Sequence, residues 1–273
     1  MADPEIVVRF WGVRDHIAVP GPETAGYGGN TPCIEVRCGN ALLIFDSGTG
    51  IRPLGQRLLR EGPIQGDIFF THAQFDRISG LPFFAAAFSP TNAFRLWAGL
   101  GDGVPGIEAV LRRLMTDPIF PVPIDVMRAR LEFHDFVTGN ALRPATDVVV
   151  RTHGFGAARR VTGYRVEHAG RAVCYVTDVA SSDSASTAAI ARFIAGADLA
   201  ILGADTETSD GASRTERSWR WAVGVGEAAG VRQLVLSNHA HDDGDVVLDR
   251  LAGLLARSHP LATLAREGLE IAV

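Results

Sequence analysis

The chain of 273 residues contains no lysine, so all 26 of its basic residues are arginine. This absence excludes chemistry that depends on a lysine side chain, such as a Schiff base or the lysine of a P-loop. The arginines are scattered rather than clustered, and the net charge is −5. Because nucleic-acid binding leaves a basic patch or stripe, the sequence carries no strong signal for such a partner.

Cysteine is also scarce, with only Cys33, Cys38 and Cys174. An odd count at wide spacing does not indicate a disulfide framework, and we interpret all three as small apolar side chains of strands. No apolar run reaches the roughly 18–20 residues of a membrane span. The N-terminus has neither a basic segment before an apolar run nor a cleavage site, so we expect a cytoplasmic protein.

Hydrophobic residues make up 47% of the chain, which suffices for one large domain, and no repeat or linker divides it. Periodicity predicts strands at 6–11, 33–38, 41–46, 67–72, 94–99, 128–136, 146–153, 162–168, 171–178, 198–204 and 232–238. It predicts helices at 51–62, 105–115, 185–195, 214–229 and 243–257, and an apolar helix core at 81–88. This order favours a mixed α/β or α+β domain whose sheets are covered by helices.

Several long strings resemble a known family. RFWGVRDHIAVPGPETAGYGGNTPCIEV with LLIFDSGTGIRPLG resembles the N-terminal hairpin and first loop of the metallo-β-lactamase superfamily, in its phosphodiesterase and ribonuclease-Z-like branch. THAQFDRISGLPFF resembles the family's metal motif H-x-H-x-D-H, and TGYRVEHAGRAVCYVTD resembles the strand pair that ends in its bridging aspartate. AAGVRQLVLSNHAHDD resembles the last strand, which delivers a final histidine. The resemblance spans nearly the whole chain.

The resemblance implies one domain over residues 1–273 with the family's αββα sandwich. Two mixed sheets would pack face to face, helices would flank them, and the site would lie along one edge. A helical insertion near 100–130 would overhang the site, and the chain would form a homodimer, as is common in this branch. In the family, two metal ions, usually zinc, activate a bridging water for hydrolysis.

Most positions where the family holds its metals carry other residues here. His72 and Asp76 match the first histidine and the aspartate of the motif, and Asp178 matches the bridging aspartate. The second histidine is replaced by Gln74, whose neutral amide is a poor ligand. The third is replaced by Arg77, which has no lone pair and would repel a cation.

The later histidine positions are altered as well. Counted without gaps, the next one falls on Ala157, and His153 could replace it only after a local shift. The last one aligns with Asn238, or with His239 if the strand end slips by one residue, and His241 is close by. The sequence leaves both choices open.

We hypothesise that the guanidinium of Arg77 takes the volume of the second metal and pairs with Asp178 or Asp76. An internal cation would then replace the metal, and no cofactor would be needed. Two alternatives stay open. Arg77 points to solvent, or a single zinc or similar ion survives on His72, Asp76, Asp178 and His239.

The mouth of this site supplies candidates for binding an anion, namely Arg77, Gln74, His16, Asp15, Asp178, Asn238 and His239. The segments GYGGN and FDSGTG can cradle a phosphate through backbone N–H groups, or they are tight turns that require a positive φ. A metal-free general base formed by Asp15 and His16 is a further alternative.

Three functions follow as hypotheses. The first is a family member without metal or hydrolase activity, acting as a binding or regulatory module for a small anionic or nucleotide-like ligand or a protein partner. The alternative is a metal-dependent hydrolase of the phosphodiesterase type with a reduced site, in which His72 and Asp76 are catalytic. The third is a structural subunit of a larger complex.

Overall fold

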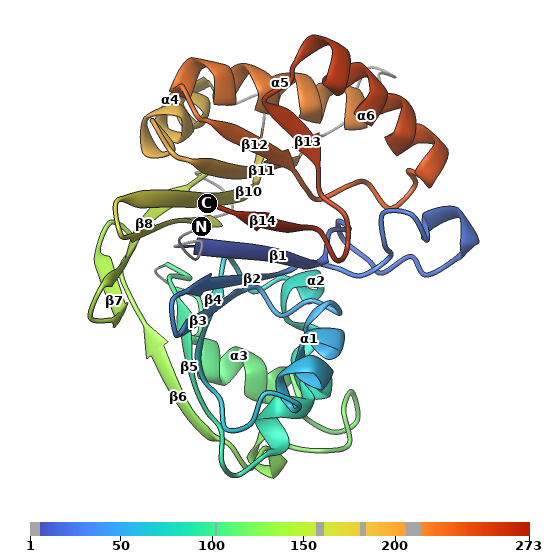
Figure 1. The fold of residues 1–273 in the computed structure, drawn as a ribbon. Coiled ribbons are helices and arrows are strands. Elements are labelled where there is room, and N and C mark those ends of the chain that lie inside the picture. Colours follow the sequence, from blue (N-terminus) through green and yellow to red (C-terminus); the bar gives the residue numbers. More distant parts are fainter. Residues whose placement is uncertain (1–5, 102, 157–160, 181–183, 206–213) are drawn as a thin grey trace.

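The computed structural model describes residues 6–101, 103–156, 161–180, 184–205 and 214–273. In them, two seven-stranded mixed sheets pack face to face, and helices lie on the outer face of each sheet (Figure 1). The αββα sandwich that the sequence predicts is confirmed. No helix among these residues is long and apolar enough to cross a membrane.

The first sheet has the strand order β14-β1-β2-β3-β4-β5-β6. Pairing is antiparallel from β14 to β3 and parallel from β3 to β6. Its strands are β1 (Ile6–Gly12), β2 (Cys33–Cys38), β3 (Ala41–Phe45), β4 (Gln65–Phe70), β5 (Ala93–Ala98), β6 (Arg130–Asp135) and β14 (Glu270–Ala272).

The second sheet has the order β13-β12-β11-β10-β9-β8-β7. Pairing is parallel from β13 to β10 and antiparallel from β10 to β7. Its strands are β7 (Ala141–Ala145), β8 (Val148–Phe155), β9 (Val161–His168), β10 (Arg171–Ala180), β11 (Leu199–Asp205), β12 (Gln233–Leu236) and β13 (Ala262–Leu264). Each sheet therefore has one half with parallel strands, whose carboxyl ends can meet at a common edge.

Helices α4, α5 and α6 cover the second sheet, and α1 and α3 cover the first (Figure 1). The helices are α1 (Ile51–Leu58), α2 (Phe75–Ile78), α3 (Ile107–Leu114), α4 (Ser184–Phe193), α5 (Arg214–Ala229) and α6 (Asp245–Ser258). Short 3₁₀ turns are η1 (Pro22–Thr24), η2 (Leu81–Phe83), η3 (Ala85–Phe88) and η4 (Ile124–Val126). The insertion expected near 100–130 contributes α3, which packs on β5 and β6.

The predicted helix at 81–88 is wrong in form, because this segment makes the turns η2 and η3 instead. Pro82 stands in the first turn of η2, and the chain leaves helical geometry at Phe84, whose ψ is 89°. Phe84 is fully buried, whereas Phe83 is exposed. The segment therefore buries side chains from two short turns rather than along one continuous helical face.

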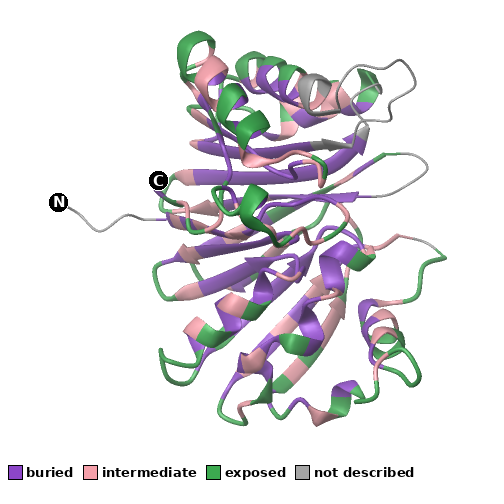
Figure 2. Cartoon of the chain, turned by 90° about the vertical axis from the view of Figure 1, so that its right-hand side faces the viewer, coloured by how far each residue is buried: buried purple, intermediate pink, exposed green. Residues whose placement is uncertain are grey.

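Three hydrophobic clusters hold the layers together. One lies between the sheets, and the other two lie between each sheet and its helices. Figure 2 shows the buried residues concentrated along the strands of both sheets. Large side chains such as Phe10, Phe45 and Tyr164 are fully enclosed. Burial of each contributes about 1.5–3 kcal/mol, so the sheets form a rigid base for the loops at their edges.

Candidate functional site

The ends of four strands bring polar side chains together at one edge of the sandwich, on the right of Figure 1, where α2 lies. Asp46 follows β3, His72 follows β4 by two residues, and Asn238 follows β12 by two residues. Asp178 stands near the end of β10, where the pairing with β11 shifts register. All four side chains are buried, so sheet topology rather than chain proximity assembles the site.

Several residues at this edge of the sandwich have strained backbone conformations. Five described non-glycine residues have a positive φ, and four of them, His16, Asp46, Asp178 and Asn238, belong to this region, with φ between 56° and 61°. Asp, Asn and His tolerate this conformation better than other residues, but it still costs free energy. Such outliers tend to concentrate at functional sites, which supports this edge as the candidate site.

Arg77 lies at the centre of the cluster and is fully buried. Its Nε is 3.0 Å from Asp76 Oδ2, its Nη1 is 3.3 Å from Asp46 Oδ2, and its Nη2 pairs with Asp178 Oδ2. Nη1 also donates to the hydroxyl of Tyr175 at 3.1 Å. The sequence predicts that Arg77 pairs with Asp178 or Asp76, and the structure shows contacts with both; the alternative of a solvent-facing Arg77 is wrong.

Charge and burial compete within this cluster. Burial lowers the pKa of Arg77, but the charges around it, Asp178 foremost, outweigh burial and hold the pKa well above its ordinary value. Burial raises the pKa of Asp178, but the charges of Arg77 and nearby histidines together with the hydrogen bond from Thr177 outweigh burial, so the pKa lies below its ordinary value. At Asp46 burial wins and the pKa is raised. Asp178 is therefore the firmest anionic partner of Arg77.

Both ring nitrogens of His72 are occupied by neighbouring side chains. Nδ1 lies 3.0 Å from Thr71 Oγ1, and Nε2 lies 2.8 Å from Gln74 Oε1. An amide oxygen only accepts, so Nε2 donates to it and keeps no lone pair for a metal. The Thr71 hydroxyl also lies 2.9 Å from Asp46 Oδ1, and it thereby links His72 to the carboxylates.

Asn238, not His239, reaches the carboxylates. Its Nδ2 donates to Thr177 Oγ1, and to Asp178 Oδ2 at 3.2 Å. The ring of His239 points elsewhere, because its Nε2 donates to the Ala265 carbonyl at 2.7 Å. Burial lowers the pKa of His239 to about 4, so it stays neutral near physiological pH. The structure thus argues against His239 as a ligand-binding or metal-binding residue.

The mouth of the site carries Asp15, His16 and His241. Asp15 Oδ2 lies 3.1 Å from His16 Nε2, and the rings of His16 and His241 are 6.0 Å apart between centroids. The charge of His16 also lowers the pKa of Asp178, which places His16 close to the cluster. His153 lies elsewhere, on β8, where its ring packs against Phe155.

Arg14 positions the loops that carry these three residues, and it was not among the site residues predicted from the sequence. It is fully buried, its Nε donates to the Gly28 carbonyl at 2.7 Å, and its Nη1 donates to the carbonyls of Asp243 at 2.6 Å and Ala240 at 3.3 Å. These bonds join the loop after β1 to the loop before α6, and so bring His16 beside His241. A polar residue inside a glycine-rich loop is the only sequence signal that could have suggested it.

The glycine-rich segments are turns rather than phosphate cradles in this structure. In FDSGTG, the backbone N–H groups of Ser47, Gly48 and Thr49 already donate to Arg77 O, Pro32 O and Thr31 Oγ1. In GYGGN, Gly28 has a φ of 99°, as a tight turn requires. These internal bonds leave the first segment without donors for an anion.

Comparison with known proteins places this architecture in a family. Residues 43–237 match the sequence model of the β-lactamase superfamily domain. The chain belongs to the metallo-β-lactamase superfamily. No curated protein sequence matches it.

Solved structures of this superfamily share the fold at low identity. A diphosphatase of the PhnP family has 18% identity and a TM-score of 0.70, with 98% of both chains covered. Zn²⁺-bound PqqB from Methylobacterium extorquens has 16% identity and a TM-score of 0.68, with 98% of this chain and 100% of that one covered. Human tRNase Z, short form, has 18% identity and a TM-score of 0.62, with 98% and 99% covered. At these identities the likeness concerns the fold alone.

The side chains present do not fit the dinuclear metal site that the superfamily implies. Arg77 already pairs with the carboxylates, and His72 offers no free lone pair. Within the described ranges, no group of three or more His, Cys, Asp or Glu side chains is placed to hold a metal ion. Ala157, the aligned position of another family histidine, lies outside the described residues.

Sequence reasoning missed three members of the cluster, Asp46, Tyr175 and Thr177. Asp46 accepts from Tyr175 at 3.0 Å, and Thr177 donates to Asp178 at 2.8 Å. Asp46 had one detectable signal, an acidic residue directly after an apolar strand. Tyr175 and Thr177 had none, because alternation within β10 gives the same pattern for any strand with one face toward the core.

Proposed function

We propose that this chain is a metal-free member of the metallo-β-lactamase superfamily that acts as a binding or regulatory module and not as a hydrolase. The observation that carries the proposal is the burial of Arg77 among Asp46, Asp76 and Asp178. Its guanidinium supplies positive charge to the carboxylates and occupies space beside them, so a metal ion could reach them only by displacing it.

The energetic argument supports this assignment. Metal binding would have to displace a fully buried guanidinium from its partners, and breaking one buried ion pair costs about 3–5 kcal/mol. It would also have to break the hydrogen bond between His72 and Gln74, which stabilises the ring by about 1 kcal/mol. Only one imidazole, that of His72, would then be available beside the carboxylates to coordinate the ion.

One observation favours the alternative, a metal-dependent hydrolase with a reduced site. His72, Asp76 and Asp178 all border the same buried cluster around Arg77. Movement of Arg77 out of the cluster would leave one imidazole and two carboxylates for a single ion such as zinc. This alternative requires a second arrangement of Arg77, and hydrolysis would then depend on added metal.

Elemental analysis of protein purified without a His-tag or chelating column separates the two functions. We expect bound zinc, manganese and iron well below one ion per chain, also after incubation with excess metal, and no turnover of a nitrophenyl phosphodiester. Near-stoichiometric metal, together with turnover that a chelator abolishes, would overturn the proposal.

The homodimer, a protein partner and a cytoplasmic location are also proposals. The resemblance to the phosphodiesterase and ribonuclease-Z-like branch supports the dimer. Sedimentation equilibrium tests it directly, because a dimer doubles the mass of the 29.1 kDa chain. A single species at the mass of one chain would contradict it.

A further inference from the structure

The cluster around Arg77 has more negative than positive charge. Asp46, Asp76 and Asp178 place three carboxylates against one guanidinium. Burial raises the pKa of Asp46, yet even with Asp46 neutral two carboxylates remain for one arginine. Each guanidinium nitrogen of Arg77 lies against a carboxylate, and only Nε, 3.0 Å from Asp76 Oδ2, makes no hydrogen bond. The electrostatics of the site therefore favour a cation.

Asn238 provides an independent indication of a missing donor. It is only 9% exposed, and in the described part of the chain its Oδ1 has no hydrogen-bond partner. The orientation of the amide is determined, because a flip would place Oδ1 against Asp178 Oδ2, which also only accepts. A buried acceptor without a donor costs about 1–3 kcal/mol, and such a group calls for a ligand or an ordered water.

We infer that this site binds a ligand with a protonated amino group, an alkylammonium, whose N–H groups meet Asn238 Oδ1 and the carboxylate of Asp178. The inference rests on the proposed function, since a metal ion in the cluster would compete for the same carboxylate. It reverses the charge of the ligand expected from the sequence, which was anionic or nucleotide-like.

An ammonium group suits these atoms better than a metal ion does. It needs two or three acceptors in its vicinity and no displacement of the proton on His72 Nε2. Asp178 Oδ2 already accepts from Arg77, Thr177 and Asn238, so Oδ1 is the oxygen left for a ligand.

Three probes of equal length and different charge test the inference by isothermal titration calorimetry near neutral pH and at low salt. They are putrescine, butanediol and succinate, which are cationic, neutral and anionic, with AMP added as a nucleotide-like anion. We expect saturable binding of putrescine alone. Binding of succinate or AMP in its place, binding of butanediol as tightly as putrescine, or no binding of any probe would overturn the inference.

Two substitutions at Asn238 locate the binding. Asn238→Gly removes the acceptor while tolerating the positive φ, and it should weaken putrescine binding about tenfold or more. Asn238→Asp keeps an acceptor oxygen and adds charge, although an oxygen replaces the Nδ2 donor to Asp178, so it should retain the putrescine binding that Asn238→Gly loses. Circular dichroism checks that both variants fold. Unchanged putrescine binding in Asn238→Gly would place the ligand elsewhere and overturn the inference.

A matched control separates this site from general attraction of cations. Asp242→Asn removes one charge near the mouth, at a side chain that is 90% exposed, and should leave putrescine affinity unchanged. If Asp242→Asn weakened putrescine binding as much as Asn238→Gly, the binding would be explained by general surface charge, and the proposed site would be refuted. Metal analysis keeps the two proposals apart: stoichiometric metal refutes the proposed function, whereas metal-free protein that ignores putrescine refutes only this inference.

Discussion

Two arginines pair with carboxylates at opposite ends of the sandwich, and their surroundings differ. Arg77, at the site edge, is fully buried and faces three carboxylates. Arg95, on β5, has a side chain that is 37% exposed and pairs with Asp67 at 2.7 Å. Arginine–aspartate ion pairs thus occur both in a fully buried setting, at Arg77, and in a partly exposed one, at Arg95.

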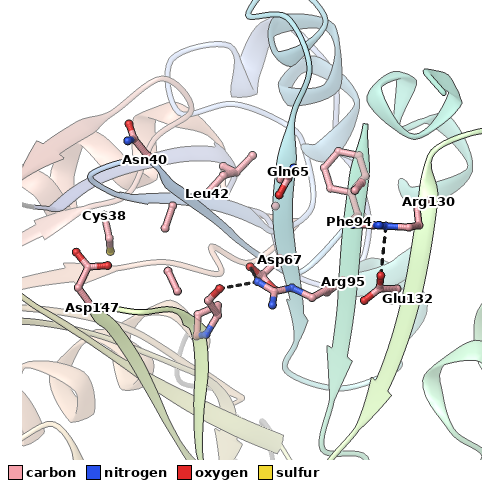
Figure 3. A pocket seen from close by; sticks show the side chains of 15 residues that line it. Cys38, Asn40, Leu42, Gln65, Asp67, Phe94, Arg95, Arg130, Glu132 and Asp147 are labelled. Atoms are coloured by element: carbon pink, nitrogen blue, oxygen red, sulfur yellow. Dashed lines mark hydrogen bonds and ion pairs between the residues drawn. The ribbon is translucent and has the colours of Figure 1, made fainter. Parts of the chain in front are cut away.

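Figure 3 shows the surroundings of Arg95, a cavity of about 550 Å³ lined by the first residues of β4, β5 and β6. Its guanidinium also donates to the Pro144 carbonyl of β7 at 2.6 Å, which connects the two sheets. The cross-strand neighbours Asp67, Arg95 and Glu132 alternate in charge, and Arg130 pairs with Glu132. The charged side chains around Arg95 are paired with each other or are in contact with solvent. The carboxylates around Arg77 are buried, so only Arg77 and their neighbours can compensate their charge.

The comparison shows how burial changes what an ion pair contributes. An exposed pair is screened by water and contributes about 0–1 kcal/mol. A buried pair adds little net stability when intact, but loss of one partner leaves a charge without water or counterion. Arg77 should therefore be far more sensitive to substitution than Arg95, although both bind aspartates.

The largest expected effect is that of Arg77→Met. The substitution keeps much of the volume but leaves Asp46, Asp76 and Asp178 facing one another without a cation. We expect the free energy of unfolding to fall by about 3–5 kcal/mol, measured by urea denaturation. A loss below about 1 kcal/mol would mean that the carboxylates find other partners, and the contrast with Arg95 would disappear.

Acid should lower the stability of the protein through protonation of His239. Its pKa is about 4 when folded, against an ordinary value of 6.5, so the unfolded chain binds more protons between these values. The free energy of unfolding should therefore fall as pH drops from about 6.5 to about 4, by about 3 kcal/mol from this residue.

Urea titrations over this pH range measure the slope. His239→Gln retains a donor for the Ala265 carbonyl but cannot titrate, so its stability should depend less on pH. An equal slope in the parent and in this variant would contradict the assignment.

Restoring the family histidines should open the site edge to metal. Gln74→His with Arg77→His removes the guanidinium and frees His72 from its amide partner, and should raise zinc affinity about tenfold or more, about 1.4 kcal/mol. Competition with a chromogenic chelator measures it, and Arg95→His is the control without gain. No increase would show that the backbone has left the family's metal geometry.

The smallest effect is expected for Arg95→Met. Asp67 keeps the hydrogen bond from Trp97 Nε1 at 2.7 Å, and solvent can reach the cavity in place of the guanidinium. We expect a loss of about 1 kcal/mol in the free energy of unfolding by urea denaturation. A decrease in the free energy of unfolding as large as that of Arg77→Met would show that solvent does not reach Asp67 in place of the guanidinium.

Periodicity predicted most of the long helices and strands, because an amphipathic pattern over many residues is still recognisable when single residues deviate from it. The antiparallel series β8, β9 and β10 follows the predicted runs within a few residues. The strands β7, β13 and β14 were missed. They have three to five residues, and β7 contains Pro144, so neither length nor composition gives a strand signal.

The candidate site was predicted in part. His72, Gln74, Asp76, Arg77 and Asp178 stand on motif strings, so their proximity followed from the resemblance, and the structure brings them together. The sequence left open whether Asn238 or His239 faces the carboxylates. The side chains of two consecutive residues after a strand point in different directions, and the turn that follows decides which of them faces the carboxylates.

The sequence by itself determined a mixed α/β or α+β domain from its periodicity, and its resemblance to the family implied the sandwich and the replacement of most family histidines. Only the tertiary structure decided that Arg77 is buried, that His72 is held by Gln74, and that Asn238 keeps an unpartnered oxygen. The reason is physical: burial, hydrogen-bond geometry and charge balance depend on residues from four strand ends, and the distances between those ends are set by packing of the two sheets.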